Sequence, residues 1–491
     1  QVPPALVNSM SCYTEFRRHP SRKIGQKLNA AVALGAVLAA LTIFADRLLP
    51  EAQAAKPVRV LNPSASNNVP AEIESFTLEN GLKIIVWPDH DIPNVVMYNF
   101  VRAGGRNEYP GITGLSHFFE HMMFNGTDKR APGEFDRVME AAGGSNNAYT
   151  SNDVTVYQDW FPRSALDTIF DLESDRLENL AFVPEVVESE RGVVFSERRT
   201  RVDNDNSGKL YEQVVATAFI AHPYQFPVIG WPSDIEAWTM EDLQSYFQTY
   251  YAPNNCTMVF VGDVTPDEIR AYAEEYFAGI PAQTPPAAVR TVEPEQLGTR
   301  RVTVQAIAQT PQLHIAFHAG AAGDEETLPL EMLLKILVDG ESSRLHRRLV
   351  EEEQLAISVG GFQSEGFDPG LAYFYLILPP GGDAQAAEAR LLELLADVAE
   401  HGVSDAELSK ARNIMLADFW RGMATIDGKA AALGNFEVFH GSYEKLFGLS
   451  EQIEGIGNER LQSVAASVFR PANVTVGLLE PLADDAPGAE Q

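Results

Sequence analysis

The sequence predicts an α+β protein with two homologous domains in tandem, each a mixed or antiparallel sheet packed with helices. Its 491 residues are too many for one ordinary hydrophobic core. Short runs rich in β-branched and aromatic residues alternate with longer helical patterns along the chain. Two segments also recur later in the chain at nearly the same offset, which indicates that one folding unit is duplicated.

The first domain is expected over residues 73–281. Asn80 and Gly81 form the Asn-Gly pair of a tight hairpin turn. Strands are predicted after this turn at 83–87, 95–101, 145–150, 154–161 and 256–261. Helices are predicted around residue 117 and at 132–142, 163–179, 184–201, 208–220, 239–250 and 266–277.

The second domain is expected over residues 299–481, after a proline-rich linker at 282–298. Residues 101–108 are echoed by 317–324, and residues 251–259 by 469–477, at offsets of 216 and 218 residues. Two independent matches in nearly one register favour duplication of the whole unit over a local coincidence.

Both ends of the chain are predicted to lie outside the folded domains. Residues 1–54 have the basic region, the apolar stretch and the Ala-x-Ala ending of an export signal. A membrane anchor is the alternative if that signal is not cleaved. Residues 55–72 are expected to form a linker and residues 482–491 an acidic tail.

Composition narrows the classes of partner and of site. The formal net charge is −31, with acidic residues spread along the chain, which argues against nucleic acid and against anionic membrane surfaces as partners. The chain has only two cysteines, Cys12 and Cys256, and the first lies in the predicted signal. A metal site in this protein must therefore be built from histidine and carboxylate side chains.

Residues 114–127 carry the clearest chemical signal. Within them His117, Glu120 and His121 stand at i, i+3 and i+4, positions that share one face of an α-helix. Two imidazoles one turn apart can hold one metal ion, and a carboxylate beside them can take the proton of a metal-bound water. The offset of the duplication leads from this motif to residues 330–337, a helical pattern without histidine. The second domain is therefore expected to keep the fold and to lack the metal site.

A tetrahedral metal site needs a third protein ligand, and the helix predicted at 184–201 offers candidates. Glu190 and Glu197 are seven residues apart and so lie on one face of that helix. Spacing alone leaves ordinary surface glutamates as an equally good interpretation. The arginines of this helix are expected to point to solvent, namely Arg191, Arg198, Arg199 and Arg201.

The motifs together resemble one family. His-Phe-Phe-Glu-His inverts the order of the commoner His-Glu-x-x-His motif, and the inverted form marks the inverzincins. With Asn-Ala-Tyr-Thr at 147–150 and Ser-Glu-Arg at 196–198, the chain resembles the pitrilysin, insulysin and mitochondrial processing peptidase family from about Phe76 to Glu480. It is most similar to the half-size bacterial members. The resemblance implies that the two domains form half of a clamshell peptidase chamber.

The resemblance also implies a set of site residues. One Zn²⁺ per chain would be bound by His117, His121 and Glu197, with Glu120 as the general base. Glu190 would support the ligands without binding the metal. Asn147 and Ala148 would lie on an edge strand that pairs with the substrate backbone. A turn residue is the alternative for Asn147.

The sequence departs from the family pattern at one place. Family members carry an Arg and a Tyr, seven residues apart, which bind substrate and stabilise the oxyanion. Val350 and Ile357 hold those positions here, after Ser-Arg-Leu at 343–345, and neither can donate a hydrogen bond. We therefore expect a homologous partner chain that supplies the Arg and Tyr in a heterodimer, with a homodimer as the alternative.

The expected function is zinc-dependent hydrolysis of peptides or unfolded segments by a periplasmic metalloendopeptidase, in which Glu120 activates the zinc-bound water. Once the signal is cleaved, no stable membrane insertion is expected. One alternative is a non-catalytic scaffold or assembly subunit of a peptidase-like complex. A narrower alternative is a processing peptidase for one dedicated precursor.

Overall fold

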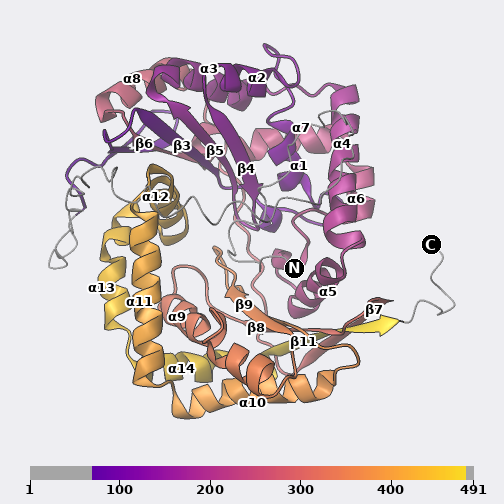
Figure 1. Cartoon of the computed structure of the whole chain (residues 1–491). Helices are drawn as coiled ribbons and strands as arrows, with labels where there is room; N and C mark the ends of the chain where they lie inside the picture. The colour runs from indigo at the N-terminus through magenta and orange to yellow at the C-terminus, as the bar shows by residue number, and fades with distance from the viewer. Residues whose placement is uncertain (1–68, 483–491) are drawn as a thin grey trace, which may run out of the picture. The chain divides into compact units, whose positions relative to one another are not determined.

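The structure is a computed structural model that describes residues 69–482. The predicted signal at 1–54, most of the 55–72 linker and nearly all of the 482–491 tail lie outside the described residues. Residues 69–482 form two α+β domains with mixed sheets, which confirms the predicted fold class (Figure 1). Within this range no helix combines the length and the apolar character that a membrane span requires.

The first sheet has six strands in the order β1-β2-β6-β3-β5-β4. All neighbours are antiparallel except β2 and β6, which run parallel. The expected hairpin joins β1 to β2, and Gly81 takes the positive φ of +88° that its turn requires. The strands are β1 (Glu74–Thr77), β2 (Lys83–Pro88), β3 (Asn94–Val101), β4 (Ser145–Thr150), β5 (Thr155–Pro162) and β6 (Cys256–Gly262).

The central strand β3 is apolar because both of its faces are covered. Val95 and Met97 point into the core beneath the helices of the first domain, whereas Val96 and Phe100 point into a second core on the other face. The first of these cores is closed by α1, α3, α7 and α8. The helices up to the linker are α1 (Leu115–Met122), α2 (Glu134–Ala141), α3 (Leu166–Glu178), α4 (Pro184–Arg198), α5 (Asn206–Ala218), α6 (Pro232–Ala237), α7 (Met240–Tyr250) and α8 (Pro266–Tyr276).

The second sheet has the order β7-β11-β8-β10-β9 and repeats the first from β2 onward, including the single parallel pair. Equivalent strands begin 213 to 218 residues apart and in the same order, so the predicted duplication is confirmed. The strands are β7 (Arg300–Ile307), β8 (Gln312–His318), β9 (Ser358–Gln363), β10 (Leu371–Ile377) and β11 (Val474–Leu482).

Helix α9 (Thr327–Val338) follows β8 as α1 follows β3, and it contains no histidine, as the offset of the repeat predicts. A turn of π-helix at His346–Glu352 separates it from β9. The remaining helices are α10 (Ala384–His401), α11 (Asp405–Gly422), α12 (Ile426–His440), α13 (Leu449–Gly455) and α14 (Asn458–Val468).

The two domains exchange one helix each. Helix α5, which precedes the linker, packs against β7, β8 and β11 of the second sheet. Helix α12, which follows the linker, packs against β3 and β6 of the first sheet (Figure 1). Each sheet therefore buries one face under a helix that belongs to the other half of the sequence.

A glycine marks each of these exchanged contacts. A Cβ at Gly434 of α12 would lie 2.0 Å from the ring of Phe100 on β3. A Cβ at Gly477 of β11 would lie 2.1 Å from Val214 on α5. Helix and strand approach so closely at both places that only glycine fits without a shift.

Candidate metal centre

Helix α1 begins in a turn that requires glycine and is anchored by a buried carboxylate. Gly114 has φ of +90°, and a Cβ there would lie 2.7 Å from the carbonyl oxygen of Ile229. The side chain of Glu108 accepts hydrogen bonds from the N–H groups of Gly114 and Ser116 and from the Ser116 hydroxyl, each at 2.7 Å. These bonds satisfy the N–H groups at the start of the helix and fix its direction.

The helix is buried on nearly every side, and its polar face turns toward α4. Phe118 and Phe119 pack into the first core. His117 is buried, whereas His121 keeps 20% of its side chain exposed. Helix α4 faces this polar side with Glu190 and Glu197, which contact the two histidines. These two residues are therefore not ordinary surface glutamates, the alternative that their spacing left open.

The ligand atoms of His117, His121 and Glu197 converge on one point. The two Nε2 atoms lie 3.4 Å apart, and the Glu197 Oε2 atom lies 3.4 Å from His117 Nε2 and 3.2 Å from His121 Nε2. Zinc bonds of about 2.0–2.1 Å in a tetrahedron separate the ligand atoms by about 3.3 Å. The three distances thus match three edges of a zinc tetrahedron. Within residues 69–482 this is the group of His, Cys and acidic side chains that could hold a metal ion.

The electrostatics of the cluster also favour a cation. Burial opposes the charged form of His121, but its contacts with Glu190 and Glu197 raise its pKa to about 10. Burial likewise opposes ionisation of Glu197, yet its hydrogen bonds to the two histidines hold its pKa well below the usual range. A divalent cation between these groups would take the place of the proton that the carboxylates attract.

Glu190 touches the cluster from outside. Its Oε1 atom lies 2.8 Å from Nδ1 of His121, the ring nitrogen that faces away from the convergence point. A carboxylate at this position sets the orientation of the imidazole ring and directs Nε2 toward a metal. This is the geometry expected for a residue that supports the ligands.

Glu120 lies on the same helix and is nearly buried, with 9% of its surface exposed. Its Oε2 atom accepts a hydrogen bond from the Thr150 hydroxyl at 2.5 Å. Thr150 is the last residue of β4, so the edge strand of the first sheet contacts the Glu120 carboxylate.

The two residues expected to bind substrate lie on β4 as well. Strand β4 is the edge of the first sheet and pairs only with β5, so one of its sides presents no strand partner. Asn147 is partly exposed, and Ala148 is buried against the core beneath α1. Asn147 is part of the strand, so the alternative of a turn residue is not what the structure shows.

The arginines of α4 and of the π-helical turn that follows it at Arg199–Asp203 correct one expectation. Arg198 was expected in solvent but is buried, and it pairs with Glu212 of α5 at 2.8 Å. Arg191 also turns inward and donates to the carbonyl of Trp238 at 2.9 Å. Arg201 pairs with Glu197 at 3.1 Å and so borders the metal ligands. Arg191 and Arg198 contact segments that are distant in the sequence. Arg201 reaches Glu197 only because the helical structure continues past Arg198. Local spacing reveals neither kind of contact.

The structure adds two residues that sequence reasoning missed. Glu108 anchors α1, and Thr150 holds Glu120. Thr150 belongs to the Asn-Ala-Tyr-Thr motif, which was the available signal, but only the pairing of β4 with β5 beside α1 gives its hydroxyl a partner.

The positions of the missing Arg and Tyr contain no hydrogen-bond donor on their side chains. Val350 lies in the π-helical turn and packs against the second core, and Ile357 is 53% exposed. Arg348 pairs with Glu352 on its own turn at 2.5 Å. The nearby Arg348 is thus held by an ion pair within its own turn.

Comparisons with known proteins agree with this geometry. Residues 89–230 match the model of the insulinase family, peptidase family M16, and residues 237–415 match the model of the peptidase M16 inactive domain. The chain is 28% identical to the zinc protease PqqE of Helicobacter pylori over 413 residues, which cover 83% of this chain and 93% of PqqE.

Two solved structures share the fold. The crystal structure of a protease from Helicobacter pylori aligns with a TM-score of 0.81 at 28% identity and covers 83% of this chain and 99% of that one. The periplasmic protease PqqL from Escherichia coli aligns with a TM-score of 0.70 at 20% identity. That alignment covers 85% of this chain but 49% of PqqL, so this chain corresponds to about half of it.

The zinc-ligand residues lie within the part that the insulinase model matches, and the match of the inactive-domain model begins at residue 237 of the first domain and continues into the second. The chain therefore belongs to peptidase family M16, a family of zinc proteases, as a half-size bacterial member.

Proposed function

We propose that this protein is a zinc-dependent metalloendopeptidase that hydrolyses peptides or unfolded segments. The observation that carries the proposal is the convergence of the ligand atoms of His117, His121 and Glu197, with mutual distances of 3.2–3.4 Å. The two histidines lie on α1, which also bears Glu120, and Glu197 lies on α4. A scaffold subunit has no need of three ligand atoms at the edge lengths of a zinc tetrahedron.

The chemistry follows from the positions of the side chains. A zinc ion held by the three ligands supplies Lewis acidity, which lowers the pKa of water and polarises the scissile carbonyl. Glu120 takes the proton of the attacking water and returns it to the departing amine. Its Oε2 atom is engaged by Thr150, so Oε1 is the oxygen assigned to the proton. The free side of β4 at Asn147 and Ala148 would pair with the substrate backbone and present one peptide bond to these groups.

The test of this function separates metal binding from proton transfer. Glu120→Gln is expected to keep one zinc per chain and to lose about 10²- to 10⁴-fold in kcat, because Gln cannot accept the proton. Glu188→Gln is the matched control, since Glu188 lies on α4 with 76% of its side chain exposed. Zinc is measured by metal analysis and turnover on a library of quenched fluorescent peptides. Undiminished hydrolysis by Glu120→Gln would remove Glu120 from the mechanism.

The same preparation tests the scaffold alternative. Removal of zinc by a chelator should abolish turnover, and added zinc should restore it. A purified chain that holds no stoichiometric zinc after loading would favour the scaffold. Cleavage of one peptide class alone in the library would favour a processing peptidase for a dedicated precursor.

We further propose that a homologous chain completes the site. Two observations support this: Val350 and Ile357 cannot donate a hydrogen bond, and the chain corresponds to about half the length of PqqL. The partner would supply an Arg and a Tyr in a heterodimer, and a second copy of this chain is the alternative. Affinity purification from the native cell is expected to recover the partner with the activity. A fully active monomer would exclude both assemblies.

We also propose that the mature chain is located in the periplasm. The export signal expected at 1–54 and the similarity to PqqL, which is a periplasmic protease, support that location. Cell fractionation with N-terminal sequencing of the recovered protein tests both the compartment and the cleavage site. Recovery from the membrane fraction with residues 1–54 still attached would favour the anchored form.

A further inference from the structure

The hydroxyl of Thr150 donates a hydrogen bond to the Glu120 carboxylate. The two oxygen atoms lie 2.5 Å apart, and Thr150 is 4% exposed. A hydrogen bond of this kind removes one rotation of the Glu120 side chain and commits Oε2. Because α1 and β4 are separate elements, the orientation of Glu120 depends on where the end of β4 is held.

The turn after Thr150 is closed tightly. Ser151 donates its N–H to the carbonyl of Val154 at 2.8 Å, and its hydroxyl oxygen accepts from the N–H groups of Asp153 at 3.2 Å and Val154 at 3.1 Å. Asp153 is 1% exposed. Asp153 lies three residues after Thr150 in this closed turn, so a displacement of Asp153 would be transmitted to Thr150.

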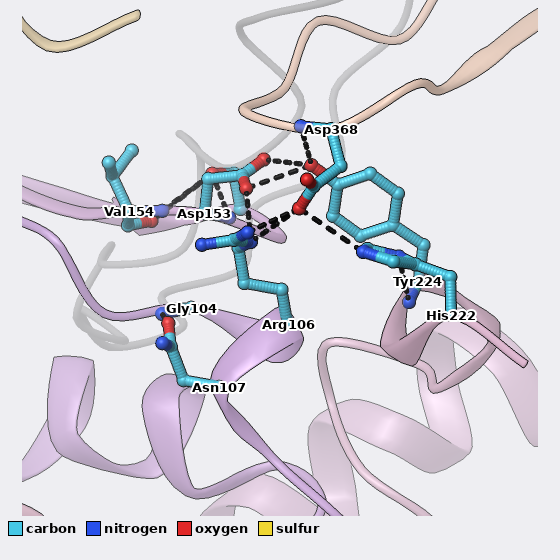
Figure 2. A network of polar contacts seen from close by, with 9 residues as sticks. Gly104, Arg106, Asn107, Asp153, Val154, His222, Tyr224 and Asp368 are labelled. Atoms are coloured by element: carbon cyan, nitrogen blue, oxygen red, sulfur yellow. Dashed lines mark hydrogen bonds and ion pairs between the residues drawn. The ribbon is translucent and has the colours of Figure 1, made fainter. Parts of the chain in front are cut away.

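Asp153 and Asp368 share a partly buried polar network that spans the two domains (Figure 2). Asp368 lies in the loop between β9 and β10 of the second domain. Its Oδ2 atom accepts from the guanidinium of Arg106, with 3.1 Å to Nε, and from Nε2 of His222 at 3.1 Å. Asp153 pairs with Nε of Arg106 at 3.2 Å and accepts from the Tyr224 hydroxyl at 2.8 Å. That hydroxyl in turn accepts from the N–H of Asp368 at 3.2 Å.

Backbone fit holds the network together. A Cβ at Gly104 would lie 2.5 Å from the backbone of Asn152, and a Cβ at Gly366 would lie 2.3 Å from the Tyr224 hydroxyl. The N–H of Arg106 also donates to the carbonyl of Asn152 at 2.8 Å. The segment that carries Arg106 leads directly to Glu108, which anchors α1. The network thus borders both segments that determine where Glu120 lies.

We propose that Thr150 is a positioning residue that orients the Glu120 carboxylate, and that Asp368 of the second domain holds Thr150 in place through Arg106 and Asp153. The inference rests on the proposed role of Glu120 in proton transfer. It assigns the domain without metal ligands a part in catalysis that runs through this chain's own contacts. Neither residue touches the substrate in this scheme.

The first experiment compares Thr150→Val with Thr150→Ser in the zinc-loaded chain, in the assembly that carries the activity. Valine keeps the shape and removes the hydroxyl, whereas serine keeps the hydroxyl. Loss of a hydrogen bond to a charged group predicts a fall of about 10- to 100-fold in kcat for Thr150→Val on a quenched fluorescent peptide. The KM and the zinc content should stay within about twofold, and Thr150→Ser should recover most of the kcat.

The second experiment tests the connection to the second domain. Asp368→Asn is expected to lower kcat severalfold, and Glu388→Gln is the control, because Glu388 also pairs with an arginine of that domain, at 2.5 Å to Arg301. Combined with Thr150→Val, Asp368→Asn should cause little further loss, because the contact that it serves is already absent.

The outcomes distinguish the inference from the function on which it rests. Full activity of Glu120→Gln would contradict the proposed function itself. An inactive Glu120→Gln beside a Thr150→Val variant of normal kcat would overturn the positioning role alone. Effects of Thr150→Val and Asp368→Asn that multiply in the double variant would show that Asp368 does not act through Thr150.

Discussion

Arg176 is a fully buried charged residue, and its contacts lead through Tyr157 to helix α1 of the metal centre. Its guanidinium lies over the rings of Phe135 and Tyr157, at 4.7 and 4.5 Å, and pairs with Glu173 at 2.5 Å. Tyr157 in turn donates its hydroxyl to the carbonyl of Phe119 on α1 at 3.3 Å. Buried Asp159 is held close enough to interact with Arg176, and burial raises the pKa of Asp159 well above its usual range. A buried cation beside two carboxylates is a position where removal of one partner is costly.

At this residue scale we predict that Arg176→Met lowers the free energy of unfolding by about 3–5 kcal/mol, because Glu173 loses its buried counter-charge. Urea unfolding followed by circular dichroism measures the change. Arg137→Met on α2, where 71% of the side chain is exposed, should stay within about 0.5 kcal/mol of the native protein. Adding Glu173→Gln to Arg176→Met should restore part of the stability. An Arg176→Met variant as stable as the control would show that the buried charges are compensated in another way.

Among the elements, α1 and α9 occupy equivalent places and have different tasks. Both helices follow the equivalent strand of their sheet, but α1 carries two histidines and a glutamate, whereas α9 is almost entirely apolar. Helix α1 needs an external anchor because its first N–H groups are buried. Glu108 supplies three hydrogen bonds there, and α9 has no side-chain cap at its start.

At the element scale we predict that Glu108→Ala destabilises the protein by about 2–3 kcal/mol and weakens zinc binding, because buried donors at the start of α1 lose their acceptor. Zinc competition against a chromophoric chelator and urea unfolding measure the two effects. Glu140→Ala, on the exposed side of α2, is the control. Unchanged zinc affinity in Glu108→Ala would mean that α4 alone aligns the ligands.

At the scale of the whole molecule, the exchange of α5 and α12 joins the two domains into one cooperative unit. Helix α12 completes a core on the first sheet with Ala430 and Leu433, and α5 completes a core on the second sheet with Leu210 and Val214. Polar bonds reinforce the join: Lys83 of β2 pairs with Glu437 of α12 at 2.6 Å. Because each sheet depends on a helix from the other half, loss of either contact should affect both domains.

We therefore predict that Gly434→Ala lowers the free energy of unfolding by about 1–3 kcal/mol, since the added methyl overlaps the fully buried Phe100. Unfolding should remain a single transition that reports both domains. Gly422→Ala, where the same methyl meets nothing within 4 Å, should be neutral or slightly stabilising. Calorimetry checks both variants. Two separate transitions in Gly434→Ala would contradict the cooperative join.

Local patterns predicted much of the fold and the centre of the site. The apolar runs of β2, β3 and β6, the Asn-Gly turn and the duplication were readable because each depends on neighbouring residues or on a repeated order. His117, Glu120 and His121 were readable for the same reason: a helix brings i, i+3 and i+4 together wherever it lies. The choice of Glu197 came from the family resemblance, since spacing alone did not separate it from surface glutamates.

The contacts that sequence reasoning missed are long-range. Arg198 was expected in solvent because the spacing within its own helix shows no partner for it. Its partner, Glu212, lies on another helix. Thr150 meets Glu120 across 30 residues, and Asp368 meets Arg106 across 262. No local period encodes such pairs, because they arise only when sheets and helices pack.

By itself the sequence determined the duplicated α+β architecture, the helix that bears the two histidines and the lack of histidine in the equivalent helix of the second domain, since spacing along the chain sets which residues share a face. Only the tertiary structure decided that the ligand atoms of Glu197 and the histidines are separated by the edge lengths of a zinc tetrahedron. It also decided that the domains exchange helices, and that the second domain reaches Thr150 through Asp153. Those relations depend on how separate elements pack, and packing is a property of the folded chain as a whole.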